Sequence, residues 1–200
     1  MKNRNNTTKL VFATNNRHKF IEIEKALGAT LELLNLNDLG FTGEIPEEQD
    51  TLEGNAAQKA YFIFNKYGLN CFADDTGLEI EALHGEPGVF SARYAGANCN
   101  FEDNMNKVLE NMKGMTNRNA RFRTVIALVE RGKLTTFAGE VRGVITLEKK
   151  GSQGFGYDPV FQPLGFERTF AEMSLEEKNR ISHRALAIQE LVNYFTMNKV

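Results

Sequence analysis

The amino-acid sequence predicts an α/β protein with a mixed central β-sheet flanked by helices. Short apolar runs alternate with segments whose apolar residues recur at helical spacing, a pattern typical of strands connected by helices. From Ala120 onward the pattern indicates consecutive strands, so part of the sheet is expected to be antiparallel. The 200 residues, 42% of them hydrophobic, are enough for a domain with a core. We therefore treat residues 1–200 as one domain and expect the polar residues 1–8 to be flexible.

The first half of the chain predicts the order strand, helix, strand, loop, helix. The apolar residues that follow position 17 recur at helical spacing and predict the first helix. Gly28 is placed to end this helix in a left-handed conformation. Pro46 stops regular structure in an acidic loop, and Asp50 with Glu53 resembles a capping box for the next helix. The expected strands are 10–13 and 31–36, the loop is 43–50, and the second helix stops near Gly68.

In the second half, two adjacent aspartates interrupt an apolar run, so a separate short strand is expected on each side of them. Asn100 and Ser182 are expected to cap helices, and Ser174 with Glu177 forms another capping-box pattern. A turn at Arg131 and Gly132 indicates a hairpin. The expected strands are 70–73, 78–82, 125–129, 134–137 and 141–147.

Charge and hydropathy exclude several classes of protein. The 24 Lys and Arg residues against 26 Asp and Glu leave a net charge of -2, which argues against a protein that coats a nucleic-acid polymer. No apolar run approaches the length of a membrane span, and the polar start is no signal peptide. Cys71 and Cys99 form no C-x-x-C pair, offer no zinc framework and are expected to be buried or half-buried. We therefore expect a soluble cytoplasmic protein.

The polar segment from Thr14 to Lys19 follows the first strand and opens the first helix. Unpaired backbone N–H groups and the positive helix end suit phosphate oxygens there, and Lys19 adds a compact positive charge. The spaced glycines of a Walker loop are missing. The alternative is a structural role, in which Asn15 or Asn16 caps the helix and Lys19 is solvated.

Asp74 and Asp75 are adjacent carboxylates, which are costly to bury unless they are paired, solvated or bound to a cation. Because side chains alternate along a strand, only one of the two can face a given site. Magnesium takes one or two carboxylates with waters and phosphates, and the loop at Glu47 and Glu48 is the obvious second donor. The alternative is a turn whose aspartates bond backbone N–H groups near Gly77.

A glycine-rich segment runs from Gly151 to Pro159. Its glycines allow the backbone to approach a flat ligand, Phe155 and Tyr157 offer aromatic faces, and Asp158 offers an acceptor for N–H groups of a base. The alternative is a plain hairpin connection.

His183 and Arg184 follow Ser182, which places both in the first turn of the last helix. Positive charges oppose the helix dipole at that position. A local cost without a local reason indicates a ligand.

In this order and spacing, these segments resemble the inosine triphosphate pyrophosphatase-like family, also called non-canonical purine nucleoside triphosphate pyrophosphatases or dITP/XTP diphosphatases. The resemblance runs from Leu10 to about Leu191. The motifs that carry it are Ala13-Thr14-Asn15-Asn16 with Lys19, Thr51-Leu52-Glu53-Gly54-Asn55-Ala56, Ala73-Asp74-Asp75-Thr76-Gly77-Leu78, the segment from Pro87 to Gly96, Gly154-Phe155-Gly156-Tyr157-Asp158-Pro159, and Ser182-His183-Arg184.

The resemblance implies two closely joined lobes with the active-site cleft between them. It implies Mg²⁺-dependent hydrolysis of ITP, dITP and XTP to the monophosphate and pyrophosphate, which clears deaminated purines from the nucleotide pool. It further implies a homodimer that acts on a nucleoside triphosphate and binds neither a nucleic-acid polymer nor a membrane.

Position by position, the resemblance implies that Asp75 is the catalytic proton acceptor and, with Glu47, a metal ligand. His183 and Arg184 are implied to hold the base, and their donors suit a 6-oxo purine. The other implied substrate contacts are the triphosphate segment Thr14, Asn15, Asn16, Arg17, His18 and Lys19, then Thr76, the phosphate-side Lys178, and the base loop Phe155, Gly156, Tyr157 and Asp158.

Two departures from the family pattern leave alternatives open. Glu47-Glu48-Gln49-Asp50 stands where the family often has Glu-Glu-Thr-Gly, so either glutamate can be the metal ligand, and we favour Glu47. Asn15 stands where many members have glycine. The rival functions are a pyrophosphatase for pyrimidine nucleotides and a non-catalytic nucleotide sensor. Ser182-His183-Arg184 together with Gly154-Phe155-Gly156-Tyr157-Asp158 favours a purine over a pyrimidine, and the presence of both Glu47 and Asp75 argues against a non-catalytic sensor.

Overall fold

The computed structural model describes residues 9–27, 32–98 and 100–197, so the expectations for residues 1–8, Gly28 and Cys99 lie outside the described residues. A six-stranded mixed sheet has the strand order β2-β1-β3-β4-β5-β6. Strand β1 pairs in parallel with β2 and β3, and the other neighbours are antiparallel. The strands are β1 Lys9–Phe12, β2 Glu32–Leu34, β3 Cys71–Ile80, β4 Asn119–Glu130, β5 Lys133–Ile145 and β6 Phe161–Pro163.

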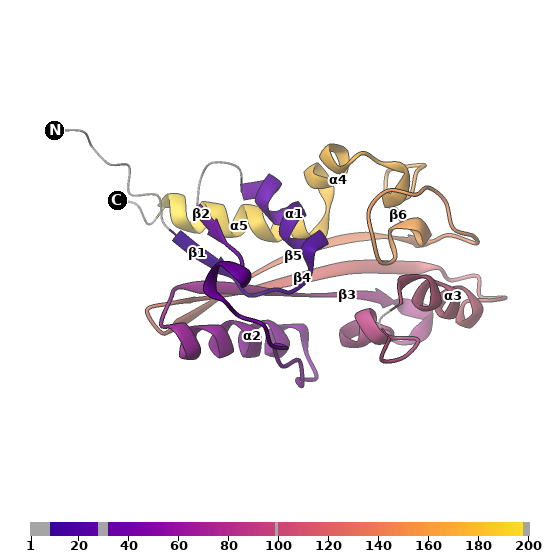
Figure 1. Cartoon of the computed structure of the whole chain (residues 1–200). Helices are drawn as coiled ribbons and strands as arrows, with labels where there is room; N and C mark the ends of the chain where they lie inside the picture. The colour runs from indigo at the N-terminus through magenta and orange to yellow at the C-terminus, as the bar shows by residue number, and fades with distance from the viewer. Residues whose placement is uncertain (1–8, 28–31, 99, 198–200) are drawn as a thin grey trace.

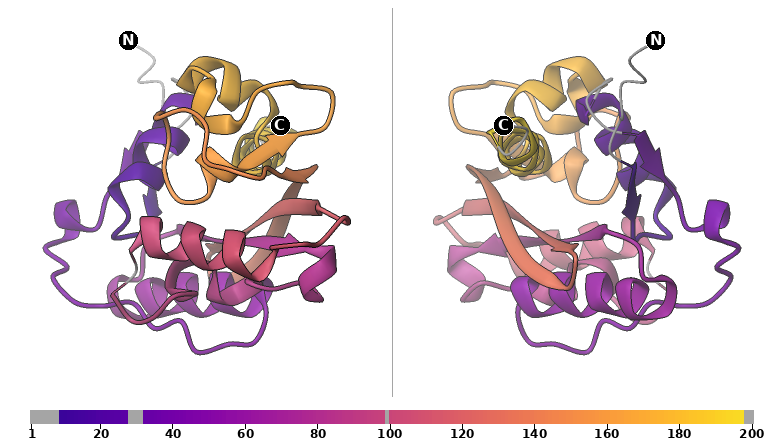
Figure 2. Two further views of the ribbon diagram at one scale, coloured as in Figure 1. Left: turned by 90° about the vertical axis from the view of Figure 1, so that its right-hand side faces the viewer. Right: turned by 90° about the vertical axis from the view of Figure 1, so that its left-hand side faces the viewer.

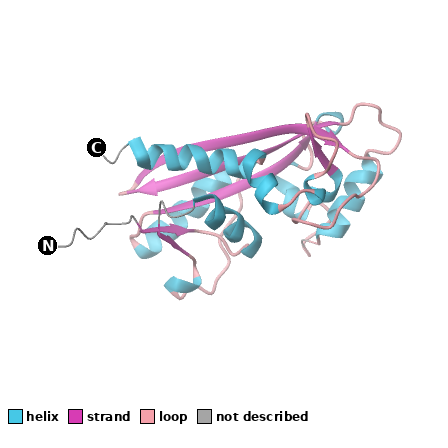
Figure 3. Cartoon of the chain, turned by 90° about the horizontal axis from the view of Figure 1, so that it is seen from above, coloured by secondary structure: helices cyan, strands magenta, loops and turns pink. Residues whose placement is uncertain are grey.

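Helices cover both faces of this sheet, as the views in Figure 1 and Figure 2 show. The α-helices are α1 Arg17–Leu27, α2 Leu52–Tyr67, α3 Phe101–Asn111, α4 Leu175–Ile181 and α5 His183–Met197. Helix α2 packs its small apolar side chains on one face, where Ala56 and Ala60 meet Ala73. Helices α1 and α5 pack on the other face, where Ile23 and Ile188 meet Phe72. Figure 3 shows α5 lying along the strands.

A third core cluster fills the far end of the long strands. Leu78 and Phe122 from β3 and β4 pack there with Met105 of α3 and Phe161 of β6. The predicted α/β class, with a mixed sheet flanked by helices, is therefore confirmed. None of the described helices is both long and apolar enough to cross a membrane.

Strand β3 is continuous where two short strands were expected, so that expectation was wrong. It runs through Asp74 and Asp75 because both carboxylates have buried partners from other elements. Gly77 belongs to the same strand and lies against the loop before α3: a Cβ there would lie 2.8 Å from the carbonyl oxygen of Gly88. Long-range ion pairs therefore replace the turn that the local sequence indicated.

Strand β5 also unites two expected strands, 134–137 and 141–147. At the position between them, a Cβ on Gly139 would lie 2.1 Å from the carbonyl oxygen of His183 and 2.5 Å from the amide of Ala187. The missing side chain lets the first turn of α5 rest directly on the strand. The predicted turn at Arg131 and Gly132 is confirmed, and it joins β5 to β4.

Most of the predicted helix caps are confirmed. Asn100 accepts from the amides of Glu102 and Asp103, and Ser174 with Glu177 forms a capping box at α4. The predicted cap of α2 was wrong by one residue, because Thr51 rather than Asp50 accepts from the amide of Gly54.

Candidate active site

A cleft of about 1020 Å³ lies between two lobes of the fold. Its lining comes from the loop after β1, the glycine-rich segment, Lys178 of α4 and the start of α5. It also comes from β3, α2, the acidic loop, α3 and the segment before α3. Every residue predicted for the site lines this cleft except Arg17 and His18.

The segment after β1 is organised by its own side chains. Thr14 accepts from the amide of Asn16, and the Asn16 carboxamide accepts from the amides of His18 and Lys19 at 3.0 and 3.2 Å. The alternative that Asn16 caps the helix is therefore confirmed. Lys19 is not solvated as that alternative supposed, since its Nζ lies 3.1 Å from Asp74. Burial lowers the pKa of Lys19, although Asp74 opposes the shift.

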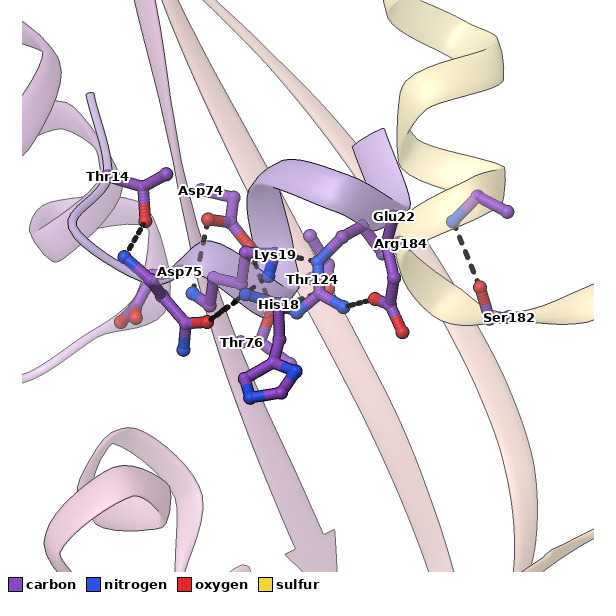
Figure 4. A network of polar contacts seen from close by, with 12 residues as sticks. Thr14, His18, Lys19, Glu22, Asp74, Asp75, Thr76, Thr124, Ser182 and Arg184 are labelled. Carbon is purple, nitrogen blue, oxygen red and sulfur yellow. Dashed lines mark hydrogen bonds and ion pairs between the residues drawn. The ribbon is translucent and has the colours of Figure 1, made fainter. Parts of the chain in front are cut away.

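The two aspartates point to opposite faces of β3, as predicted. Asp74 is 1% exposed and pairs with Lys19 and with Arg184, whose Nε lies 3.3 Å away (Figure 4). Burial alone would raise the pKa of Asp74, but Lys19 and Arg184 outweigh it and hold the pKa well below the ordinary value.

Asp75 faces α2 and the acidic loop. Its carboxylate accepts from the Asn55 carboxamide at 3.2 Å and lies 3.4 Å from Nζ of Lys59. Burial raises the pKa of Asp75, despite the nearby Lys59. A raised pKa makes this carboxylate a better proton acceptor than an exposed aspartate.

Lys59 is a central residue of the site that the sequence analysis missed. Its ammonium bonds to both Glu47 and Asp75, and the residue is 5% exposed. Burial alone would lower the pKa of Lys59, but Asp75 and Glu47 outweigh it and hold the pKa above its ordinary value. Lys59 lies on the face of α2 that also carries the buried Ala56 and Ala60, so a charged residue within that apolar face was the available signal.

The carboxylates of Glu47 and Asp75 fit a divalent cation. Both converge on the ammonium of Lys59, so a positive charge already lies between them. Glu48 instead bonds to Gln58 through its amide and its carboxylate. The described residues hold no cluster of three acidic or histidine ligands. Two carboxylates are nevertheless the number magnesium uses when phosphates and waters complete its shell.

The glycine-rich segment bends around Asp158. The carboxylate of Asp158 accepts from the amide of Phe155 at 2.8 Å and from Nζ of Lys178 at 2.7 Å, so it holds the loop. Tyr157 is 5% exposed and donates to the carbonyl of Ser91. Phe155 is half-buried and is therefore the more exposed aromatic face of the two.

The structure places Lys178, for which the resemblance implies a phosphate-side role, beside the glycine-rich segment. Its ammonium bonds to Asp158 and Glu22, and it lies 5.1 Å from the centre of the Phe155 ring. Glu22, which the sequence analysis missed, also bonds to Arg184. Burial alone would raise the pKa of Glu22, but Arg184 and Lys178 outweigh it and lower the pKa.

His183 and Arg184 begin α5 without the electrostatic cost that the sequence suggested. Burial, together with Arg184 and Lys178, lowers the pKa of His183 well below 6.5, so its ring is neutral. Arg184 is offset by Glu22 and Asp74. The Nδ1 atom of His183 is buried and has no hydrogen-bond partner among the described residues. Because buried polar atoms are rarely unpaired, this atom indicates a ligand.

We expect the burial of His183 to make stability fall on mild acidification. The unfolded imidazole binds a proton below pH 6.5 while the folded one stays neutral, so the contribution is complete above that pH and is lost below it. The free energy of unfolding should fall by roughly 1 kcal/mol over the first pH unit. Urea unfolding at several pH values measures this slope. The His183→Gln variant should lack it, and equal slopes in both proteins would contradict the assignment.

The sequence profile of the Ham1 family matches residues 10–194. The chain is 51% identical to the dITP/XTP pyrophosphatase of Flavobacterium johnsoniae over 191 residues, which cover 96% of this chain and 100% of that protein. It is likewise 51% identical to the dITP/XTP pyrophosphatase of Porphyromonas gingivalis over 192 residues, covering 96% and 99% of the two chains.

A solved structure of the Staphylococcus aureus Ham1 protein is similar to this fold, with a TM-score of 0.87 and 35% identity over 96% of this chain and 100% of that one. A HAM1 protein from Coxiella burnetii gives a TM-score of 0.88 and 36% identity over the same shares. Sequence and fold agree along nearly the whole chain, and on that ground it belongs to the Ham1 family.

Proposed function

We propose that this chain hydrolyses purine nucleoside triphosphates that carry a 6-oxo group, namely ITP, dITP and XTP, to the monophosphate and pyrophosphate. The observation that carries the proposal is the composition of one cleft. The acid pair Glu47 and Asp75 lies in the same cleft as the capped loop before α1, and that cleft is also lined by the glycine-rich segment and by His183, whose Nδ1 is unpaired among the described residues. The dITP/XTP pyrophosphatase names of the relatives support the same reaction.

In this mechanism Asp75 accepts a proton from the water that attacks the α-phosphorus, or orients that water. Lys19 and Lys59 offset the negative charge of the triphosphate and of the departing pyrophosphate. Glu47 and Asp75 would hold Mg²⁺, which supplies polarisation of the phosphoryl oxygens when bound.

Base selection would come from the other end of the cleft. In the tautomer that carries its proton on Nδ1, His183 donates to a 6-oxo group, whereas the 6-amino group of adenine would leave that donor unmatched. Arg184 uses three of its five N–H groups on Glu22, Asp74 and Thr76, so its guanidinium keeps donors for a ligand. An unmatched buried donor can discriminate by about 10⁴.

A pyrophosphate-release assay on ITP, XTP, dITP, ATP and GTP, with and without Mg²⁺, tests the proposal. We expect Mg²⁺-dependent release from the deaminated substrates and far less from ATP. Equal efficiency on ATP and ITP would refute the donor argument. Turnover of pyrimidine nucleotides alone would favour the first rival, and binding of ITP without turnover would favour a nucleotide sensor.

The two adjacent glutamates are expected to differ in their effect on magnesium. Because Glu47 points at Lys59 and Asp75 while Glu48 is held by Gln58, Glu47→Gln should raise the Mg²⁺ concentration needed for half-maximal rate about tenfold or more. The Glu48→Gln variant should shift this Mg²⁺ concentration much less. Measuring the rate of each variant over a range of Mg²⁺ concentrations compares the two shifts, and a larger shift for the Glu48 variant would reverse the ligand assignment.

The homodimer implied by the resemblance and the cytoplasmic location expected from the sequence belong to this proposal as well. Sedimentation equilibrium on the full chain tests the dimer, and cell fractionation tests the location.

A further inference from the structure

Three aromatic rings from three elements meet beside the cleft, and we call them the aromatic cluster: His18 of α1, Phe101 of α3 and Phe155 of the glycine-rich segment. The imidazole of His18 stacks on Phe155, with ring centroids 5.1 Å apart and planes 24° apart. Phe101 lies 6.0 Å from Phe155 and 6.4 Å from His18. Phe101 and Phe155 line the cleft, so the cluster lies beside the segment expected to bind the base.

The neighbours of Phe155 differ in how firmly they are held. The cations of Lys178 and Arg184 lie 5.1 and 5.5 Å from its ring centre, and both are fixed by buried ion pairs with Glu22. The imidazole of His18 is exposed and makes no hydrogen bond or ion pair with any described residue. Figure 4 shows this ring extending away from the polar network. Unlike Lys178 and Arg184, His18 can therefore move away from Phe155 without breaking a buried ion pair.

His18 also differs from the other residues of its segment. The backbone amide of His18 is fixed by the Asn16 cap, and the next side chain, Lys19, turns inward to Asp74. The side chain of His18 turns instead toward the aromatic ring of Phe155. Within one turn of helix, the segment thus places a cation among the buried charges and a flat ring beside the base loop.

We propose that His18 is a base-binding residue that stacks on the bound purine, which inserts between its imidazole and Phe155 with Phe101 supporting the imidazole from α3. The inference rests on the proposed function and deepens it, since it assigns His18 to the base and not to the triphosphate. Insertion of the purine breaks the stacked pair of His18 and Phe155 and forms two new pairs, one between the base and each ring. If the base simply displaced His18, the same pair would break and only the pair of base and Phe155 would form. Insertion therefore leaves a net gain of one stacked pair.

The test compares His18→Ala, His18→Phe and the unmodified full-length enzyme. We expect His18→Ala to raise the KM for ITP about threefold to tenfold with little change in kcat, because one stacked pair is lost. His18→Phe should restore the KM, since it keeps a flat ring. Inhibition by inorganic tripolyphosphate, which has no base, should be unchanged. His84→Ala is the matched control, because it removes an exposed imidazole that, unlike His18, does not stack on Phe155.

Three results would overturn the inference. An unchanged KM would mean that His18 does not contact the substrate, and a lowered KM would mean that it competes with the base. Weaker inhibition by tripolyphosphate in His18→Ala would place it on the phosphates. Calorimetric titration of IMP into the unmodified enzyme and into His18→Ala measures the contact with the base without turnover. Failure of the unmodified enzyme to release pyrophosphate from ITP would instead count against the proposed function.

Discussion

Replacing Asp75 by Asn is expected to reduce kcat for pyrophosphate release by about 10²–10⁴. The carboxamide keeps the shape of the side chain and can still bond to Asn55, but it cannot accept the proton of the attacking water. It also removes one of the two carboxylates available to a metal ion. Glu47 still pairs with Lys59, so the buried ammonium keeps a counter-charge and the fold should persist. Steady-state rates and thermal unfolding of the same preparation measure both effects.

Glu79→Gln is the matched control for this variant. Glu79 lies on the same strand and the same face as Asp75, four residues further on, but it pairs with Arg121 away from the cleft. Its turnover should remain close to that of the unmodified protein. Turnover by Asp75→Asn within about threefold of normal would contradict the assigned role.

Replacing Gly139 by Ala is expected to have the largest effect on stability. The added Cβ would lie 2.1 Å from the carbonyl oxygen of His183, and that neighbour is backbone, which cannot rotate away. Helix α5 must therefore shift off the sheet, at a cost of about 3 kcal/mol. Thermal unfolding should record a loss of about 10 °C. Because the shifted turn carries His183 and Arg184, the KM for ITP should rise as well.

Ala138→Val provides the comparison for the glycine. Ala138 is the preceding residue of β5, it is exposed, and its side chain points to the opposite face of the sheet. Valine adds more volume there than alanine adds at Gly139, and it suits a strand. If both variants unfolded at the same temperature, the close approach of α5 would not be the determinant.

The element types and the helix caps were predictable because they depend on nearby residues. Helical spacing, the side-chain cap of Asn100 and the capping box of Ser174 with Glu177 are all local patterns, and the structure has them. The predicted sheet class followed from the alternation of such elements. The lining of the cleft agrees with the positions implied by the family resemblance, with Arg17 and His18 as the exceptions.

The remaining features depend on contacts between residues far apart in the chain. Strand β3 continues through two aspartates because Lys19, Lys59 and Arg184 come from three other elements. Nothing within a short window of sequence reports those partners. The phosphate-side role of Lys178 is implied by the family resemblance, whereas the position of its ammonium depends on Glu22, which lies 156 residues away in the chain.

Because side chains along β3 point alternately to its two faces, the chemistry depends on how this strand pairs during folding. Asp74 joins α1 and α5 to the sheet, while its neighbour Asp75 faces the opposite way toward Lys59. A slip of one residue against β4 would exchange the two carboxylates, because each step along a strand reverses the face. Under the proposed function, strand register therefore selects which aspartate accepts the proton, and accurate pairing of β3 with β4 is itself a condition for that role.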